Sequence, residues 1–321
     1  NMRNISLDLL KVLLALFVML IHLKFLSTYY PEISYFLVNG IFRVAVPTFL
    51  VINGYFLCQI IGTEKFRIQI KKLLILYIAW MIVYAKFWAI NNNTTELILT
   101  IFFGYHLLWY IPGLILSAIM LNCMRNVKAT HLLYISITLL VIGFFIQNSI
   151  NASAIHIETD SELAKIVLYR NFIFDCFPFL CVGYLINRCN IIEKMHKINT
   201  PIIMITLALS ISALAFESWF NLSTYGKDKP IDLFISALPL SSILFLTFIR
   251  TAIMGRTKIM SNFATAIFFT HLLCIIIARK ILSTIHMENE AVIYILTIAL
   301  AIIASISLAK TKEKYKNMPL L

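Results

Sequence analysis

Charged residues are scarce in this chain. Asp, Glu, Lys and Arg together make up 13% of the 321 residues, whereas hydrophobic residues make up 60%. A soluble domain is roughly a quarter charged and about half apolar, so this composition excludes an ordinary soluble protein. It predicts instead an integral protein that passes through a membrane several times.

Long polar stretches are also lacking. Apolar runs close to the ~20 residues that cross a ~30 Å hydrocarbon core follow one another along the sequence. Ten such runs lie at about 7–28, 35–61, 69–90, 107–124, 131–148, 171–187, 201–220, 231–250, 261–282 and 291–309. No segment between them is long enough for a soluble domain. We therefore expect one integral domain over 1–321, an all-α polytopic bundle of about ten transmembrane helices.

Positive charge is unevenly divided between the two predicted sides of the membrane. Of the 24 lysines and arginines at or beyond the ends of the runs, 17 lie on the side that also carries both termini. Since basic loops stay in the cytoplasm, we expect both termini there. This topology accounts for the net charge of +12 without a nucleic-acid partner. The basic face would also attract anionic membrane lipids.

Paired cysteines are missing as well. The six cysteines form no C-x-x-C pair and show no metal-ligand spacing with histidine. We expect no metal site and interpret the cysteines as small packing residues.

The first apolar run nevertheless carries ionisable residues along its length. Asp8, Lys11 and His22 lie in LDLLKVLLALFVMLIHLKFL, where such groups are costly and usually functional. Lys11 and His22 are almost three whole turns apart, so they share one helix face about 16 Å apart along the axis. Asp8 is one turn from Lys11 and could pair with it. The alternatives are a snorkelling lysine and a helix–helix hydrogen bond for the histidine.

The second run, FRVAVPTFLVINGYFL, adds a cation that cannot lose its proton. Arg43 reaches about the depth of His22 from the outer side, so the two could face each other across a polar cavity. Pro47 removes a backbone donor and is expected to kink the helix, while Asn53 and Gly54 permit a close approach or a break. Irregular helices of this kind line the ligand sites of membrane enzymes and transporters.

Aromatic residues gather at the outer end of the fourth run. GYHLLWYIP contains Tyr105, His106, Trp109 and Tyr110. Such residues form either an interfacial aromatic belt or a platform for a sugar ring.

Two later runs each contain an ionisable residue away from their ends. Asp175, in FDCFPFLCVGYLI, lies about one turn inside the run 171–187, where an acid is a functional or pairing group. His271 lies near the middle of its run in IFFTHLLC, in either a functional or a packing role.

The first two runs together resemble the membrane acyltransferase-3 family. In that family the first helix reads approximately L-D-x-L-R-x10-H and the second R-x-x-V-P-x-F-F-x-I-S-G-Y-F-L. The present LDLLK and RVAVPTFLVINGYFL are similar, with Lys11 in place of the commoner arginine and Asn53 in place of serine. LLWYIPGL, PFLCVGYLI and IFFTHLLC resemble later family patterns, so the resemblance spans essentially the whole chain.

The resemblance implies transfer of an acyl group, commonly acetyl, from cytoplasmic acyl-coenzyme A to an extracytoplasmic carbohydrate at a bacterial inner membrane. The acceptor would be O-antigen, capsule, another surface polysaccharide or a lipid-linked glycan precursor. His22 would act as general base or as a covalent acyl carrier, and the sequence leaves both open. The residues expected to act in catalysis are His22, Arg43 and Asp175. Those expected to bind the donor are Lys11, Arg43, Lys65, Arg67, Lys71 and Lys72. Those expected to bind the acceptor are Tyr105, His106, Trp109, Tyr110 and His271.

A transporter or flippase is the alternative, because ten to twelve spans with helices kinked at mid-membrane also characterise carriers. No convincing internal repeat relates residues 1–160 to 161–321, which counts against it. The identity of the acceptor, the acyl chain and the oligomeric state, a homodimer included, stay open.

Overall fold

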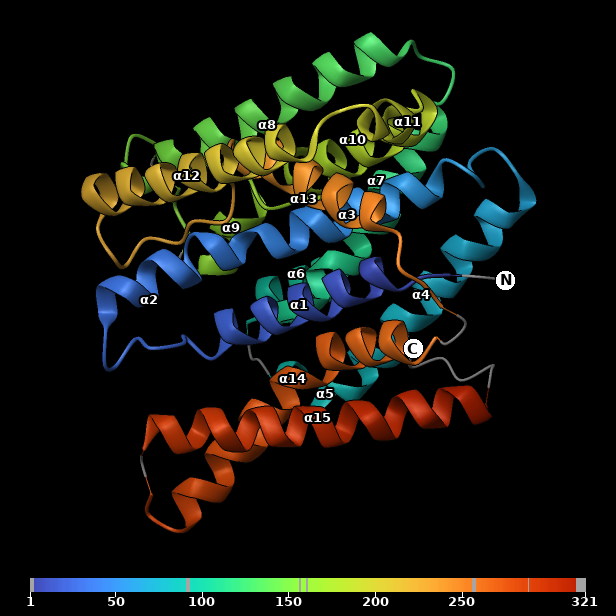
Figure 1. The fold of residues 1–321 in the computed structure, drawn as a ribbon. Helices are drawn as coiled ribbons and strands as arrows, with labels where there is room; N and C mark the ends of the chain where they lie inside the picture. The colour runs from blue at the N-terminus through green and yellow to red at the C-terminus, as the bar shows by residue number, and fades with distance from the viewer. Residues whose placement is uncertain are drawn as a thin grey trace. The chain divides into compact units, whose positions relative to one another are not determined.

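The computed structural model describes residues 3–90, 93–155, 157–159, 161–255, 258–287 and 289–315, and these are helical over most of their length (Figure 1). The chain divides into two compact units. The first holds the residues up to 45 and those from 247 onward, and the second holds residues 46–246. The predicted all-α membrane helix bundle is confirmed.

The first unit is built on three long helices: α1 (Ile5–His22), α14 (Ile259–Thr284) and α15 (Glu290–Lys314). Two shorter elements follow α1: α2 (Pro31–Val38) and η1 (Ile41–Val44). Ahead of α1, β1 (Arg3–Asn4) pairs antiparallel with β2 (Met254–Gly255), which precedes α14. This small ladder brings the beginnings of α1 and α14 to the same end of the unit.

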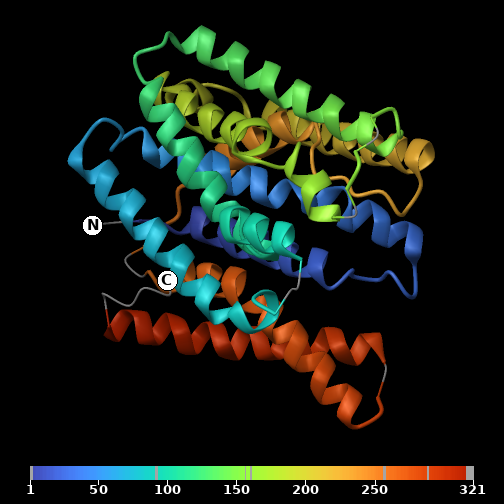
Figure 2. The ribbon, with the colours of Figure 1, turned by 180° about the vertical axis from the view of Figure 1, so that it is seen from behind.

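Capping and apolar packing hold these helices in place. The side chain of Asn4 accepts the N–H of Leu7 at 3.2 Å at the start of α1, and Asn289 accepts the N–H of Ala291 at 2.9 Å at the start of α15. Helices α14 and α15 run side by side (Figures 1 and 2). The core shared with α1 consists of Met19, Leu23, Cys274, Ile275, Leu282, Ile293, Tyr294 and Ala301.

The second unit contains the other elements: α3 (Ala45–Leu57), α4 (Glu64–Val83), α5 (Ala85–Trp88), α6 (Thr94–Phe103), η2 (His106–Trp109), α7 (Tyr110–Cys123), α8 (Ala129–Asn151), α9 (Glu162–Val167), η3 (Phe172–Cys176), α10 (Phe177–Arg188), α11 (Ile191–His196), α12 (Thr200–Tyr225) and most of α13 (Ala237–Thr251). Its centre is formed by α7, α8, η3 and α10, which contact one another.

Two glycines let α3 and α10 approach each other closely. A Cβ atom added to Gly54 would lie 1.9 Å from the carbonyl oxygen of Leu180, and one added to Gly183 would lie 2.0 Å from that of Val51. No side chain fits at either position without moving a backbone, so the predicted close approach at Gly54 is confirmed.

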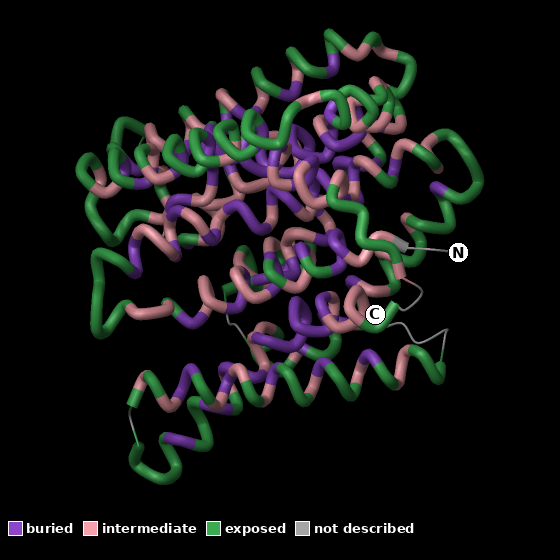
Figure 3. Tube along the Cα trace, viewed as in Figure 1, coloured by how far each residue is buried: buried purple, intermediate pink, exposed green. Residues whose placement is uncertain are grey.

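Seven helical segments of the described residues are long and apolar enough to cross a membrane: 5–22, 31–57, 106–123, 129–151, 200–225, 259–284 and 290–314. Each of the ten predicted runs contains helix. Long stretches of α12 and α15 are exposed (Figure 3), and large apolar side chains such as Leu209 and Ile295 lie on them. An apolar surface of this kind suits contact with lipid. The number of crossings and the side on which the termini lie stay predictions.

Two details of the predicted helices are wrong. The run 35–61 is not one continuous α-helix but is interrupted between Val38 and Ala45, whereas α3 continues through Asn53 and Gly54. Pro47 falls in the first turn of α3 rather than in its middle. The run 231–250 begins with non-helical backbone, and α13 starts only at Ala237.

Candidate active site

The first unit places an ion pair at the beginning of α1. The Lys11 ammonium lies 3.8 Å from a carboxylate oxygen of Asp8, as the one-turn spacing predicts. The side chain of Asp8 is 2% exposed and that of Lys11 22%. A carboxylate in the first turn also interacts favourably with the helix dipole. The predicted pairing is confirmed, and the lysine remains partly accessible.

The last turn of α1 carries His22, which lies against His271 of α14. The two imidazole centroids are 5.2 Å apart and their planes differ by 36°. His271 is fully buried, and its Nδ1 lies 3.0 Å from the carbonyl oxygen of Ile267. Because α1 and α14 begin at the same end of the unit, residues far apart in sequence reach the same height on neighbouring helices. The sequence did not predict this pair.

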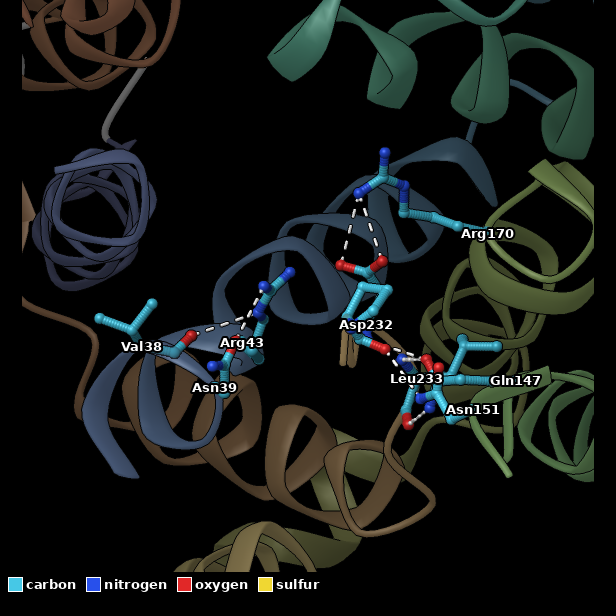
Figure 4. Close-up of polar contacts among 9 residues, drawn as sticks. Val38, Asn39, Arg43, Gln147, Asn151, Arg170, Asp232 and Leu233 are labelled. Carbon is cyan, nitrogen blue, oxygen red and sulfur yellow. Dashed lines mark hydrogen bonds and ion pairs between the residues drawn. The ribbon is translucent and has the colours of Figure 1, made fainter. Parts of the chain in front are cut away.

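Arg43 lies in η1, and its guanidinium folds back on the end of α2 (Figure 4). Its Nε donates to the carbonyl oxygen of Val38 at 3.2 Å, and Nη2 donates to the side-chain oxygen of Asn39 at 3.1 Å. Carbonyl groups at a helix C-terminus lack helical partners, so an arginine there stabilises the helix end. Arg43 therefore fixes the interruption between α2 and η1. The expected apposition of Arg43 and His22 stays a prediction.

The second unit contains a cavity of about 310 Å³ with aromatic walls. Tyr105, His106 and Trp109, three residues predicted to face the acceptor, line it together. Burial raises the pKa of the Tyr105 hydroxyl, which therefore stays protonated at neutral pH and able to donate. The other lining residues are Phe87, Trp88, Glu96, Thr100, Phe103, Gly104, Leu163, Ile166, Val167 and Arg170. A few polar groups among aromatic rings are typical of a small-molecule site.

Arg170 lines this cavity and also contacts residues around it. Its guanidinium carbon lies 5.1 Å from the centre of the Trp109 ring, within the range of a cation–π interaction. One of its nitrogens, Nη1, lies 3.3 and 3.4 Å from the two carboxylate oxygens of Asp232 (Figure 4). Both side chains are largely buried, with 20% and 7% exposed. The ion pair therefore holds the guanidinium beside the tryptophan.

Asp232 is held in turn by α8. The side-chain oxygen of Gln147 accepts the N–H groups of Asp232 and Leu233 at 2.8 and 2.9 Å, and its nitrogen donates to the carbonyl of Leu233 (Figure 4). One turn further along α8, Asn151 donates to the carbonyl of Pro230. These side chains satisfy the backbone of the non-helical segment ahead of α13, which would otherwise be buried without partners.

A second cavity, of about 450 Å³, lies on the other side of α9. It shares Ile166 with the aromatic cavity, and its lining is more strongly charged. The remaining lining residues are Ile150, Asn151, Ser153, Ile155, Ile157, Glu162, Lys165, Tyr169, Asp228, Lys229 and Pro230. The loop 149–170, expected to meet an acceptor, thus borders two adjoining cavities.

Tyr110 and Asp175 lie elsewhere in the second unit. The hydroxyl of Tyr110 accepts a hydrogen bond from Asn53 at 2.7 Å, and Tyr110 is not among the residues that line the aromatic cavity. Asp175 is buried in η3, a single π-helical turn whose N-cap is Asn171. Such turns are frequent at functional sites. The catalytic role of Asp175 itself stays a prediction.

The basic residues expected to face the donor occupy the first part of α4. Lys65, Arg67, Lys71 and Lys72 are all exposed, and Arg67 pairs with Glu64 at 3.0 Å on the surface. Because these four cations are exposed, they suit an anion that binds from solvent rather than an anion held in a buried site. Lys11 and Arg43, the other residues expected to bind the donor, belong to the first unit.

Comparison with known families supplies the remaining observation. A family model described as an acyltransferase domain matches residues 4–310. Curated proteins and solved structures give no match.

Proposed function

From the premise that the chain belongs to the acyltransferase-3 family, we propose that it transfers an acyl group, in the first place acetyl, from cytoplasmic acyl-coenzyme A to a hydroxyl of an extracytoplasmic carbohydrate. The observation that carries this proposal is the family match over nearly the whole membrane chain, residues 4–310. The acceptor would be O-antigen, capsule, another surface polysaccharide or a lipid-linked precursor, at a bacterial inner membrane.

His22 is proposed to perform the transfer. As general base, its unprotonated ring nitrogen takes the proton of the carbohydrate hydroxyl while that oxygen bonds to the thioester carbon. The carbon–sulfur bond then breaks, and the proton passes to the leaving thiolate. In the covalent alternative the imidazole attacks the thioester first and the hydroxyl attacks the acyl-histidine. Both routes consume one thioester and one hydroxyl, and yield one ester and one thiol.

The donor is proposed to bind through charge. Lys11 is paired with Asp8 and still partly accessible, so it offers a cation to an anionic group without being an isolated charge in the membrane. The exposed cations of α4 would attract the phosphates of coenzyme A. Arg43 would stabilise the oxyanion or anchor the donor, with Asp175 as a further candidate acid.

The aromatic cavity of the second unit is proposed to bind the acceptor. Trp109 and Tyr105 present rings on which a sugar can stack, and His106, Glu96 and Arg170 add polar groups that can bond its hydroxyls. The adjoining charged cavity would extend this surface along a glycan chain.

The test is acyl transfer in membranes. Cells or vesicles receive labelled acetyl-coenzyme A on the cytoplasmic side, and label is measured in surface polysaccharide for wild type and His22→Ala. We expect at least a 100-fold loss in the variant at equal membrane insertion. Full activity of His22→Ala would remove His22 from the chemistry. Wild-type protein that moves a substrate across liposomes but binds no coenzyme A would instead be a carrier.

A further inference from the structure

His271 presents an unused hydrogen-bond acceptor in the core of the first unit. The residue is 0% exposed, and its Nδ1 lies 3.0 Å from the carbonyl oxygen of Ile267, one turn earlier in α14. A carbonyl can only accept, so Nδ1 carries the hydrogen of the neutral imidazole. Nε2 is then the acceptor nitrogen, and it has no hydrogen-bond partner among the described residues. Buried polar atoms of this kind usually have a partner.

The imidazole of His22 neighbours the His271 ring. The two centroids are 5.2 Å apart, and the ring centroid of Phe268 lies 6.3 Å from that of His271. Hydrogen bonds in catalytic groups are often longer in the free protein and close when substrate binds. At a centroid separation of 5.2 Å, a closer approach of the two rings in the substrate complex would let a ring nitrogen of His22 donate to Nε2 of His271.

The scaffold keeps the two rings at one height. The pairing of Arg3 with Gly255 ties the beginnings of α1 and α14 together, and a Cβ atom at Gly255 would meet the side chain of Ile5. Met19 and Leu23, which precede and follow His22 in the sequence, belong to the same buried core as Cys274 and Ile275, which follow His271 in α14. His271 thus lies next to His22 on a long helix rather than on a loop.

We propose that His271 is a positioning residue for His22: its Nε2 accepts a hydrogen bond from one ring nitrogen of His22, which keeps the hydrogen on that nitrogen and makes the other nitrogen the one that acts in acyl transfer. This inference rests on the proposed function. When His22 takes the proton of the hydroxyl, the hydrogen on its first nitrogen stays bonded to His271, which itself gains and loses no proton. The proton taken from the hydroxyl leaves with the thiolate.

The experiment compares two substitutions of nearly equal size. His271→Gln keeps an acceptor near the position of Nε2, whereas His271→Met fills the same space without a comparable acceptor. We expect kcat for acyl transfer to fall at least tenfold in His271→Met and to be largely restored in His271→Gln. The Kd for acyl-coenzyme A should be unchanged in both. Thr270→Val, at a buried neighbour whose hydroxyl bonds only within α14, is the control and should retain the wild-type kcat.

A second readout follows His22 without turnover. Carbethoxylation of histidine requires an unprotonated ring nitrogen, and its rate at His22 can be read by mass spectrometry in membranes. We expect the rate to fall in His271→Met and to recover in His271→Gln. If His271→Met does not fold, His271→Asn takes its place, because it keeps a donor near Ile267 but no acceptor at the position of Nε2.

Two results would overturn the inference: equal kcat in the Gln and Met variants, or an unchanged carbethoxylation rate at His22 in His271→Met. Both leave the proposed function intact as long as His22→Ala is inactive. Activity of His22→Ala would instead contradict the proposed function itself, so the two failures are distinguishable.

Discussion

A single lysine in a membrane helix is stabilised here by an acid one turn away. Asp8 is buried while Lys11 reaches partial exposure, so the pair hides the negative charge and leaves the positive one accessible. Removing one partner of a buried ion pair is usually more harmful than removing both, because the remaining charge loses its compensation. Single and double substitutions of Asp8 and Lys11 can therefore distinguish the effect of Lys11 on stability from its proposed role in binding the donor.

The prediction for Lys11 concerns binding and stability together. Lys11→Ala should weaken binding of acyl-coenzyme A several-fold and lower the free energy of unfolding by about 1–3 kcal/mol, because Asp8 keeps its charge in an apolar setting. Lys11→Arg should preserve most of both. The double variant Asp8→Ala/Lys11→Ala should regain stability but not donor binding. Calorimetric titration and thermal unfolding in detergent measure the two quantities, and unchanged donor affinity in Lys11→Ala would refute the role.

The prediction for Arg170 concerns the acceptor. Arg170→Lys keeps the charge but loses the planar group that lies beside Trp109 and contacts both oxygens of Asp232. We expect the KM for the carbohydrate to rise about 5–10-fold, equivalent to roughly 1–1.4 kcal/mol, with no change in the Kd for acyl-coenzyme A. Arg279→Lys, at a half-exposed arginine paired with Glu290, is the control. A change in donor affinity without a change in acceptor KM would contradict the assignment.

At the scale of the elements, helix contact in the second unit depends on the absence of two side chains. Gly54 and Gly183 lie against backbone carbonyls of the opposing helix, and a carbonyl held in a helix cannot move aside as a flexible side chain would. Close packing of this kind is common where membrane helices associate, since small residues permit backbone approach.

The prediction for this contact is a loss of stability. Gly183→Ala should lower the free energy of unfolding by about 1–3 kcal/mol, because α3 and α10 must separate to admit the methyl group. Thermal unfolding of purified protein in detergent measures the effect. Leu209→Ala, at an exposed position of α12, provides the control and should unfold close to wild type. Equal transitions for Gly183→Ala and wild type would mean that the two helices do not pack as described.

Sequence patterns predicted most elements but not the places where they stop. Apolar runs of the right length located helix in all ten segments, because the pattern reports the lipid environment directly. The sequence did not predict the non-helical segment before α13, because the hydrogen bonds of its backbone are made by Gln147 and Asn151 from a helix distant in sequence. A glutamine and an asparagine one turn apart at the end of an apolar run were the available signal. The sequence also did not predict the interruption before Ala45, because it depends on the hydrogen bond that Arg43 donates to the carbonyl oxygen of Val38.

The candidate site was predictable in its residue types and less so in its pairings. Asp8 and Lys11 are neighbours on one helix, so their contact followed from spacing alone. His22 and His271 are almost 250 residues apart in the sequence, and the ladder of β1 with β2 helps to bring their helices to a common end. The sequence identified Arg170 only as one of the basic residues on the outer side. Its contacts with Asp232 and Trp109 were not predicted, because neither residue is close to it in sequence.

At the scale of the whole molecule, the distribution of charge makes a prediction that is independent of the site. Seventeen of the 24 lysines and arginines at or beyond the run ends fall on one side, and basic residues near short loops resist translocation. Fusions after Lys128 and after Asp228 test this. A fluorescent reporter that folds only in the cytoplasm should be active after Lys128, and a phosphatase that folds only outside should be active after Asp228. The reverse pattern would place the aromatic cavity on the cytoplasmic side and with it the carbohydrate acceptor, which the proposed function does not allow.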